Sequence, residues 1–169
     1  ALGQLKTQTD AKGQVTTLAY DEFGRLTAKT NPTQNGFWYH DKTAAGAWCA
    51  AGLARTCETR AGQPAPSNAV IVSETITYDA LNRPQQTATT QGGRTFTSSV
   101  GYDSATGRVV RQTYPSGFAV GYTYSAAGSG RMPGVLERVF NNASPADAFW
   151  SLQGIDPATV FDARGNLMR

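Results

Sequence analysis

Large apolar side chains alternate with small or polar ones along several stretches of the chain. Over residues 118–124 the large side chains stand two positions apart, at Phe118, Val120, Tyr122 and Tyr124. Residues 71–78 show the same period, with Glu74 as the exception on the apolar face, and so do residues 94–102. Because successive side chains of a strand point to opposite faces, this pattern predicts half-buried β-strands rather than helices.

A short phrase recurs between these stretches and forms an internal repeat. It runs from an aromatic residue through Asp and two or three spacers to Gly or Asn, then a polar residue or Arg, then an apolar residue. Copies lie at 20–26, 78–84 and 102–109, with a degenerate fourth copy at 161–167. Asp accepts hydrogen bonds from turn amides, and Gly or Asn takes the positive φ that closes a type I turn with a bulge. With a second class of turn between the copies, turn signals fall roughly 11 or 12 residues apart, except for the gap between residues 21 and 79, and this spacing predicts an antiparallel meander.

These copies, together with the Pro115-Ser116-Gly117 turn between them, resemble the RHS/YD-repeat family. The resemblance covers most of residues 1–30 and 73–130 and a last fragment near residue 160. In that family the repeats form a long β-sheet that spirals into a hollow shell. The shell encloses a toxic C-terminal domain in bacterial polymorphic toxins and insecticidal toxin complexes, and animal teneurins contain a related barrel. The resemblance therefore implies a curved sheet of YD-repeat hairpins, a shell segment of a secreted or cell-surface bacterial protein, with the remaining repeats and an enclosed cargo domain as partners.

The repeat pattern divides the chain into four parts. Residues 1–30 and 73–140 hold YD repeats, while residues 31–72 form a loop-rich insertion that contains both cysteines. Residues 141–169 are expected to hold one short helix and then a partial repeat. Ser144-Pro145-Ala146-Asp147 is typical of a helix N-cap with Pro at the first helical position, so we predict a helix over residues 146–152. A second short helix is predicted over residues 44–55, although Gly46 and Gly52 interrupt it.

Composition and charge narrow the functional classes. Charged residues make up 16% of the chain and the net charge is +3, without the clustered basic patch that nucleic-acid binding requires. No stretch approaches the roughly 18 apolar residues of a membrane span. Both ends break within the repeat pattern, so we expect an excised segment of a longer polypeptide. Such a segment leaves two sheet edges unpaired, and we expect these edges to be covered or to drive self-association.

The two cysteines, Cys49 and Cys57, allow three interpretations. Eight positions apart within one insertion, they could form a local disulfide, or they could be free buried thiols. A zinc site would need about four ligands, and only His40 and perhaps Asp41 or Glu58 could join them, so a metal is the poorest match.

Residues that could carry chemistry are few. His40 is the only histidine, and no nucleophile-elbow, P-loop or metalloprotease motif accompanies it. The repeated aspartates have a sufficient structural role at their turns. In the family, self-cleavage belongs to an Asp-Pro-x-Gly pattern, but Asp156-Pro157-Ala158-Thr159 lacks the Gly. We therefore predict no catalytic residue, no cofactor and no metal, and a structural rather than enzymatic role.

The aromatic residues of the insertion support an alternative function. Tyr20, Tyr78, Tyr102 and Tyr124 follow the strand pattern and are expected to pack on the sheet, but Phe37, Trp38, Tyr39 and Trp48 are less constrained. They could form a small satellite core. If exposed, Trp38, Tyr39 and Trp48 could instead stack on a carbohydrate or dock on a cell-surface receptor, since aromatic rings combine a large apolar area with a polar handle.

Overall fold

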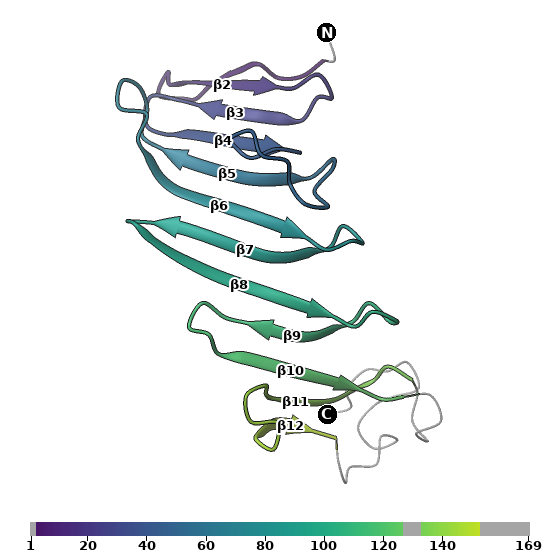
Figure 1. Ribbon diagram of the computed structural model, residues 1–169. Coiled ribbons are helices and arrows are strands. Elements are labelled where there is room, and N and C mark those ends of the chain that lie inside the picture. The colour runs from purple at the N-terminus through teal and green to yellow at the C-terminus, as the bar shows by residue number, and fades with distance from the viewer. Residues whose placement is uncertain (1–2, 127–132, 153–169) are drawn as a thin grey trace. The chain divides into compact units, whose positions relative to one another are not determined.

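The computed structural model describes residues 3–126 and 133–152, and all regular structure in that part of the chain is β-structure. Twelve strands follow one another in chain order as a single sheet that does not close, so β1 and β12 are its edges (Figure 1). Every resolved pairing is antiparallel, and the predicted all-β antiparallel meander is confirmed. The strands are β1 (Thr7–Thr9), β2 (Val15–Tyr20), β3 (Leu26–Thr30), β4 (Asn35–His40), β5 (Thr56–Gly62), β6 (Val70–Tyr78), β7 (Pro84–Gln91), β8 (Arg94–Tyr102), β9 (Val109–Thr113), β10 (Ala119–Tyr124), β11 (Leu136–Asn141) and β12 (Ala148–Ser151).

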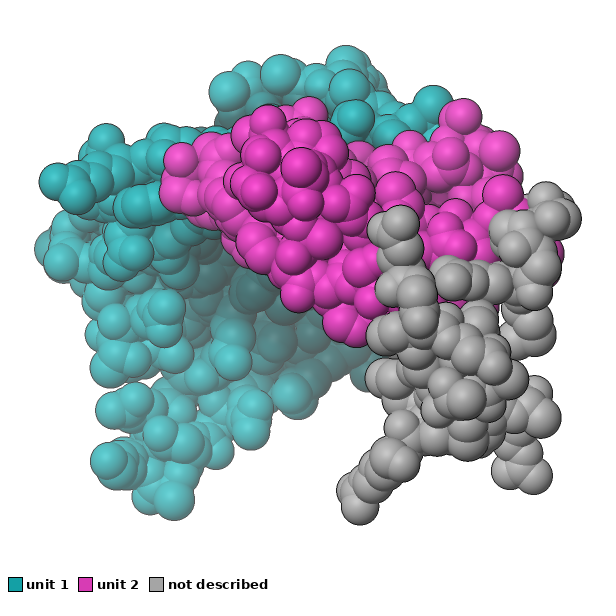
Figure 2. Space-filling model, turned by 90° about the horizontal axis from the view of Figure 1, so that it is seen from below, with its two compact units in different colours: residues 1–98 teal, residues 99–169 magenta. Residues whose placement is uncertain are grey.

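The chain consists of two compact units, residues 1–98 and residues 99–169, which Figure 2 colours separately. Large side chains that are fully buried are scarce in the described residues: Leu152 and Cys57 are the largest below 2% exposure. Large apolar residues such as Phe23, Leu53 and Leu81 are instead mostly exposed. Backbone pairing and turns, more than a thick apolar core, define the order of the strands.

The turn predicted for the YD phrase is confirmed in three copies. The amide of Asp21 donates to the carbonyl of Arg25 over 3.0 Å, and Asp79 donates to Arg83 over 2.9 Å. Asp103 donates to Arg108 over 2.8 Å. The residue before each Arg has a positive φ, 80° at Gly24, 61° at Asn82 and 72° at Gly107. The sheet register shifts beside each repeat tyrosine, as a bulge requires.

The same closing contact also follows β4 and β10, where the sequence has no recognisable YD phrase. The amide of Asp41, which follows His40, donates to the carbonyl of Arg55 over 3.0 Å. Ser125, which follows Tyr124, donates to Val135 over 2.9 Å. A register shift lies beside His40 and another beside Tyr124, as in the other copies. His40-Asp41 is therefore a repeat position whose turn has been expanded to residues 41–55.

The aromatic side chain at the start of each repeat phrase also links successive turns. The Tyr78 hydroxyl donates to the carbonyl of Thr56 over 2.7 Å, and the Tyr124 hydroxyl donates to Val109 over 2.8 Å. His40 Nε2 lies 2.8 Å from the carbonyl oxygen of Leu26, to which it donates. Each acceptor is the first residue after the Arg that closes the preceding turn. The histidine thus takes the place of a repeat tyrosine.

The sequence-based boundaries differ from the structure in the expected insertion. The sequence predicts a loop-rich insertion over residues 31–72, but strands β4 and β5 lie within that range and continue the sheet. The predicted helix over residues 44–55 is absent, because positive φ at Gly46, Ala51 and Ala54 breaks that segment into turns.

The predicted helix over residues 146–152 is also wrong. Ser144 begins a turn, with the Asp147 amide donating to its carbonyl over 2.9 Å, and β12 follows directly. Pairing with β11 supplies the backbone hydrogen bonds that a short isolated helix would otherwise provide. The degenerate copy at 161–167 lies outside the described residues.

Candidate functional site

The expanded turn, residues 41–55, is built from small nested turns. Lys42 and Trp48 form an isolated antiparallel bridge, and the Gly46 amide donates to the Thr43 carbonyl over 2.9 Å. The Cys49 amide donates to the Asp41 carbonyl over 2.9 Å. These contacts return the chain to the base of the turn, so Arg55 can close it as Arg25 closes a short one.

The expanded turn is fastened to strand β5 by a disulfide and by a buried carboxylate. Cys49 is bonded to Cys57, and Gly52 is buried against both, because a Cβ at Gly52 would lie 2.6 Å from that of Cys49. Glu58 is 4% exposed; its carboxylate accepts from the Ala44 amide over 2.9 Å and pairs with the guanidinium of Arg60. The turn is thereby held in one position over unit 1.

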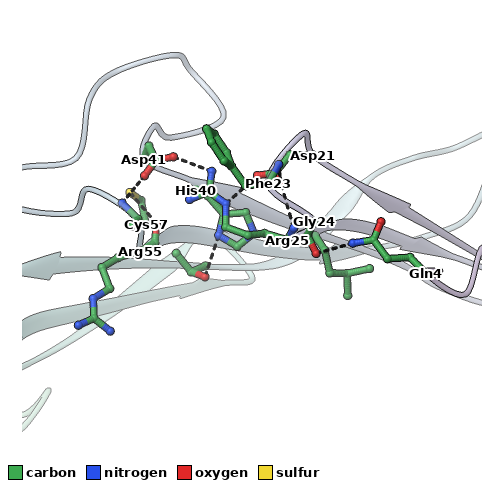
Figure 3. Close-up of polar contacts among 12 residues, drawn as sticks. Gln4, Asp21, Phe23, Gly24, Arg25, His40, Asp41, Arg55 and Cys57 are labelled. Carbon is green, nitrogen blue, oxygen red and sulfur yellow. Dashed lines mark hydrogen bonds and ion pairs between the residues drawn. The ribbon is translucent and has the colours of Figure 1, made fainter. Parts of the chain in front are cut away.

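Arg25 joins the expanded turn to the neighbouring repeat turn (Figure 3). Its guanidinium lies 2.7 Å from the Asp21 carboxylate and 2.6 Å from the Asp41 carboxylate. The hydrogen bond from Arg25 lowers the pKa of the Asp41 carboxyl by more than desolvation raises it. Desolvation would raise the pKa of Asp21, but hydrogen bonds from Arg25 and Phe23 outweigh it and lower that pKa. Both carboxyls are therefore held in their charged form.

A pocket of about 600 Å³ opens between the two turns, and we call it the aromatic pocket. The three residues predicted to contact a ligand or partner, Trp38, Tyr39 and Trp48, all line it. Trp48 is 69% exposed, whereas Trp38 and Tyr39 are half-buried in β4. The predicted cluster is therefore brought together in space, although its members differ in exposure.

Two exposed apolar side chains that sequence reasoning did not select also line the aromatic pocket. Phe23 is 73% exposed and Leu53 is 72% exposed. A cation lies over each exposed ring: Lys42 Nζ is 4.3 Å from the Trp48 centroid and Arg25 Cζ is 5.3 Å from the Phe23 centroid. One face of each ring is thus already occupied. Phe23 could have been selected from the sequence only if His40-Asp41 had been recognised as a further copy of the repeat, because its turn then lies beside the turn that carries Phe23.

His40 has a structural role in this site. Its Nε2 donates to the Leu26 carbonyl, and its Nδ1 lies 3.1 Å from the Thr56 hydroxyl, from which it accepts. Both ring nitrogens are engaged in joining strands. Among residues 3–126 and 133–152, no group of three or more His, Cys, Asp or Glu side chains is placed to hold a metal ion.

The repeated turn geometry points to one structural family. Residues 1–35 match the family model described as RHS Repeat. The match supports assigning this chain to the RHS/YD-repeat family. A search of curated proteins found no match. RHS repeats are structural shell repeats, generally non-catalytic and typically extracellular or at the cell surface. In the part of this RHS-repeat chain that the structure describes, no helix is long and apolar enough to cross a membrane.

Proposed function

We propose that this RHS-repeat chain is a non-catalytic wall segment of a shell that encloses or scaffolds a toxin or effector cargo of a secreted or cell-surface bacterial protein. The observation that supports it most strongly is the recurrence of one closing backbone hydrogen bond, donated by the amides of Asp21, Asp41, Asp79, Asp103 and Ser125. Strands joined this way pair with their neighbours in chain order, so the sheet can extend indefinitely by adding repeats.

The exposed apolar side chains support this proposal. Val70 and Ile71 at the start of β6 are 50% and 51% exposed, and Phe96 in β8 is 48% exposed. Single exposed apolar residues are ordinary, but a sheet that carries many of them is suited to packing against further protein. Within the described residues no strand pairs with the outer side of β1 or β12, which leaves both edges for further repeats.

Protease protection tests the shell function in a polypeptide that contains this segment, its remaining repeats and its cargo. Thr75 lies in the middle of β6 and pairs with both β5 and β7. Thr75→Pro removes a donor from a central strand and should open the wall, whereas Thr75→Val keeps the strand intact. We expect the cargo to become protease-sensitive with Thr75→Pro alone. Cargo that is already accessible in the wild-type polypeptide would refute enclosure.

A second candidate function is binding of a carbohydrate or a cell-surface receptor at the aromatic pocket. The observation that favours it is the expanded turn itself, because short turns suffice at Asp21, Asp79 and Asp103. That turn carries Trp48 and Leu53, both about 70% exposed over the pocket. Loops on a rigid scaffold are common sites of recognition.

Trimming the expanded turn tests this second function. Residues 42–54 are replaced by Glu-Phe-Gly, the sequence of residues 22–24, so that Asp41 and Arg55 close a short turn; Cys57→Ala removes the unpaired thiol. Glycan-array and cell-surface binding should be lost in the trimmed chain and retained in the wild type. Equal binding by both chains would place recognition elsewhere.

A further inference from the structure

The disulfide between Cys49 and Cys57 has one fixed end and one movable end. Cys57 belongs to β5, which pairs with β4 on one side and with β6 on the other, and it is 1% exposed. Cys49 lies in the expanded turn and is half-buried, with its Cα 6.1 Å from that of Cys57. A reductant can therefore reach the bond from the side of Cys49, whereas the sheet holds Cys57 in place.

The disulfide is the connection between residues 50–53 and the sheet. In the described structure the hydrogen bonds made by these residues stay within the expanded turn. The Gly52 amide donates to the Cys49 carbonyl over 3.1 Å, and the Gly52 carbonyl accepts from the Arg55 amide over 2.9 Å. The Leu53 side chain is 72% exposed. Reduction of the disulfide therefore leaves this part of the turn without attachment to β5.

Other contacts hold the first half and the base of the expanded turn. The Ala44 amide donates to the buried Glu58 carboxylate over 2.9 Å, and the Cys49 amide donates to the Asp41 carbonyl over 2.9 Å. The Asp41 amide and the Arg55 carbonyl close the base as they do in a short turn. None of these contacts involves a sulfur atom, so the base of the turn and the pairing of β4 with β5 can persist in the reduced chain.

Gly52 sets the direction in which the reduced turn moves. It is buried, and a Cβ there would lie 2.6 Å from Cys49 Cβ and 3.3 Å from Cys57 Sγ, so its backbone packs directly against the disulfide. Two thiols need more room than a bonded pair, because atoms that are not bonded stand roughly 3.5–4 Å apart. Since the sheet holds Cys57 and Gly52 leaves no free space beside the sulfurs, Cys49 and residues 50–53 must move outward together. A single backbone hydrogen bond, from the Cys49 amide, opposes that movement.

We propose that the Cys49–Cys57 disulfide is a redox switch that controls the aromatic pocket. A thiolate of a dithiol reductant attacks Sγ of Cys49, the S–S bond breaks, and Cys57 leaves as a thiolate that takes up a proton. The second thiol of the reductant then displaces Cys49, which takes up the second proton, and the reductant leaves as a disulfide. Reduction thus releases residues 48–53 from β5. Because Trp48 and Leu53 line the aromatic pocket, their release removes part of its apolar wall.

The proposed location supplies the change of environment to which such a switch responds. Disulfides persist outside the cell, whereas thiol reductants of the cytosol keep cysteines reduced. A secreted or cell-surface segment would keep its expanded turn fastened until it met a dithiol reductant in a cytosol. The inference rests on the second candidate function only for its effect on binding, since release of the turn is observable without a ligand.

The experiment compares the ¹⁵N-labelled 169-residue chain before and after treatment with dithiothreitol, a dithiol, with mass spectrometry to confirm reduction. We expect the backbone order parameters of residues 48–53 to fall from about 0.85 to below about 0.6, while those of β4 and β5 stay near 0.85. Unchanged order parameters at residues 48–53 in the reduced chain would overturn the proposal. Loss of the β4–β5 backbone contacts would also overturn it, because the disulfide would then be needed to hold the sheet. So would a disulfide that dithiothreitol fails to reduce in the folded chain.

Two variants assign the effect to this bond. The double variant Cys49→Ala, Cys57→Ala should show the order parameters of the reduced chain and no response to dithiothreitol, because the chain holds no other cysteine. The trimmed chain, which lacks residues 42–54 and carries Cys57→Ala, should be equally unresponsive. A double variant whose residues 48–53 stay ordered would overturn the proposal, because the turn would then be held without the disulfide.

Binding is measured separately from release of the turn. The double alanine variant should bind cell surfaces at least about tenfold more weakly than the oxidised wild type, since it no longer holds Trp48 and Leu53 at the aromatic pocket. Equal binding by the trimmed and oxidised wild-type chains would refute the second candidate function and leave the order parameters to decide the switch. Binding that is lost on trimming but undiminished in the double alanine variant would refute control of the pocket.

Discussion

At the scale of single residues, the repeat depends on a few side chains that make several hydrogen bonds each. One oxygen of Asp79 accepts from the amides of Leu81 and Arg83, both over 2.9 Å, and the other pairs with the Arg83 guanidinium. Asp21 makes the same set of contacts with Phe23 and Arg25. In these two copies the Asp of the phrase therefore both forms the turn and is the anion of an ion pair.

These carboxyls give the chain an acid-sensitive stability. At Asp21 and Asp79, desolvation is the largest single effect and raises the pKa, but several hydrogen bonds together outweigh it. At Asp41 and Asp103, a side-chain hydrogen bond is the largest effect and lowers the pKa. In all four carboxyls the pKa therefore falls below 3.8 in the folded chain. A lowered folded pKa means that stability is fully present above about pH 4 and is lost as the pH falls through the folded value. We expect the thermal unfolding midpoint, followed by circular dichroism, to be level from pH 7 to about pH 5 and to fall steadily below pH 4.

The combined variant Asp21→Asn, Asp79→Asn, Asp103→Asn separates this effect from general acid denaturation. It should unfold at a lower temperature than the wild type at pH 7, and its further loss on acidification should be smaller. The same fall below pH 4 in both chains would rule out the turn carboxyls as its source.

A second residue-scale prediction concerns a strand glycine. A Cβ at Gly121 in β10 would overlap the Phe140 ring of β11, whereas a Cβ at Gly101 in β8 would lie 3.4 Å from Cβ of Arg111, an ordinary contact. Gly121→Ala should lower the free energy of unfolding by about 1–3 kcal/mol, because the ring is forced aside. Gly101→Ala should change it by less than about 0.5 kcal/mol. Urea denaturation of the two variants checks both values, and equal losses would contradict the packing of Phe140 on Gly121.

At the scale of elements, strands and turns alternate along the sheet, and the expanded turn differs from the YD turns mainly in its length. The turns that follow β2, β4 and β6 lie along one side of unit 1 (right in Figure 1), so the expanded turn occupies a place that a YD turn occupies elsewhere. The Asp41 and Arg55 backbone contact is the same as in the short copies, despite the added residues. The expanded turn is an addition to the repeat rather than a separate domain.

The trimmed chain therefore makes an element-scale prediction. Replacing residues 42–54 by Glu-Phe-Gly should leave strands β4 and β5 paired, because the closing contact needs Asp41 and Arg55 alone. Far-UV circular dichroism and the β4–β5 backbone nuclear Overhauser contacts should be retained, with thermal unfolding still cooperative. Loss of the β5 signals would show that the disulfide-bonded turn is required to form the sheet.

At the scale of the whole molecule, the described sheet has two free edges. β1 is three residues long and fully exposed, and β12 carries Phe149, which is 58% exposed. An unpaired edge with apolar side chains is a template for association with another chain.

We predict concentration-dependent self-association of the 169-residue chain in sedimentation-velocity experiments. Phe149→Lys places a charge on the edge strand and should shift the equilibrium toward monomer. Leu81→Lys is the control, since Leu81 is 67% exposed but lies in the turn between β6 and β7, far from either edge of the sheet. A wild-type chain that remains monomeric at all concentrations would contradict edge pairing as the mode of association.

Much of the fold could be predicted from sequence because its determinants are local. The period-two pattern over residues 94–102 gives the bounds of β8 as observed, and Asp79 and Asn82 specify their turn within five residues. The predicted residues Trp38, Tyr39 and Trp48 line one pocket, and they are close in sequence: Trp38 and Tyr39 lie at the end of β4 and Trp48 lies in the expanded turn that follows. Local chemistry sufficed for each of these.

The sequence by itself thus determined the alternation of strands, the YD turns and the family to which they belong, since each depends on contacts between near neighbours. Tertiary structure alone revealed that His40 replaces a repeat tyrosine, because its acceptor, Leu26, is 14 residues away. It also decided that residues 148–151 form a strand, because β11 offers partners that outweigh a local helix cap. The tertiary structure also places the turn of Asp21 and Arg25 beside the expanded turn, which completes the lining of the aromatic pocket.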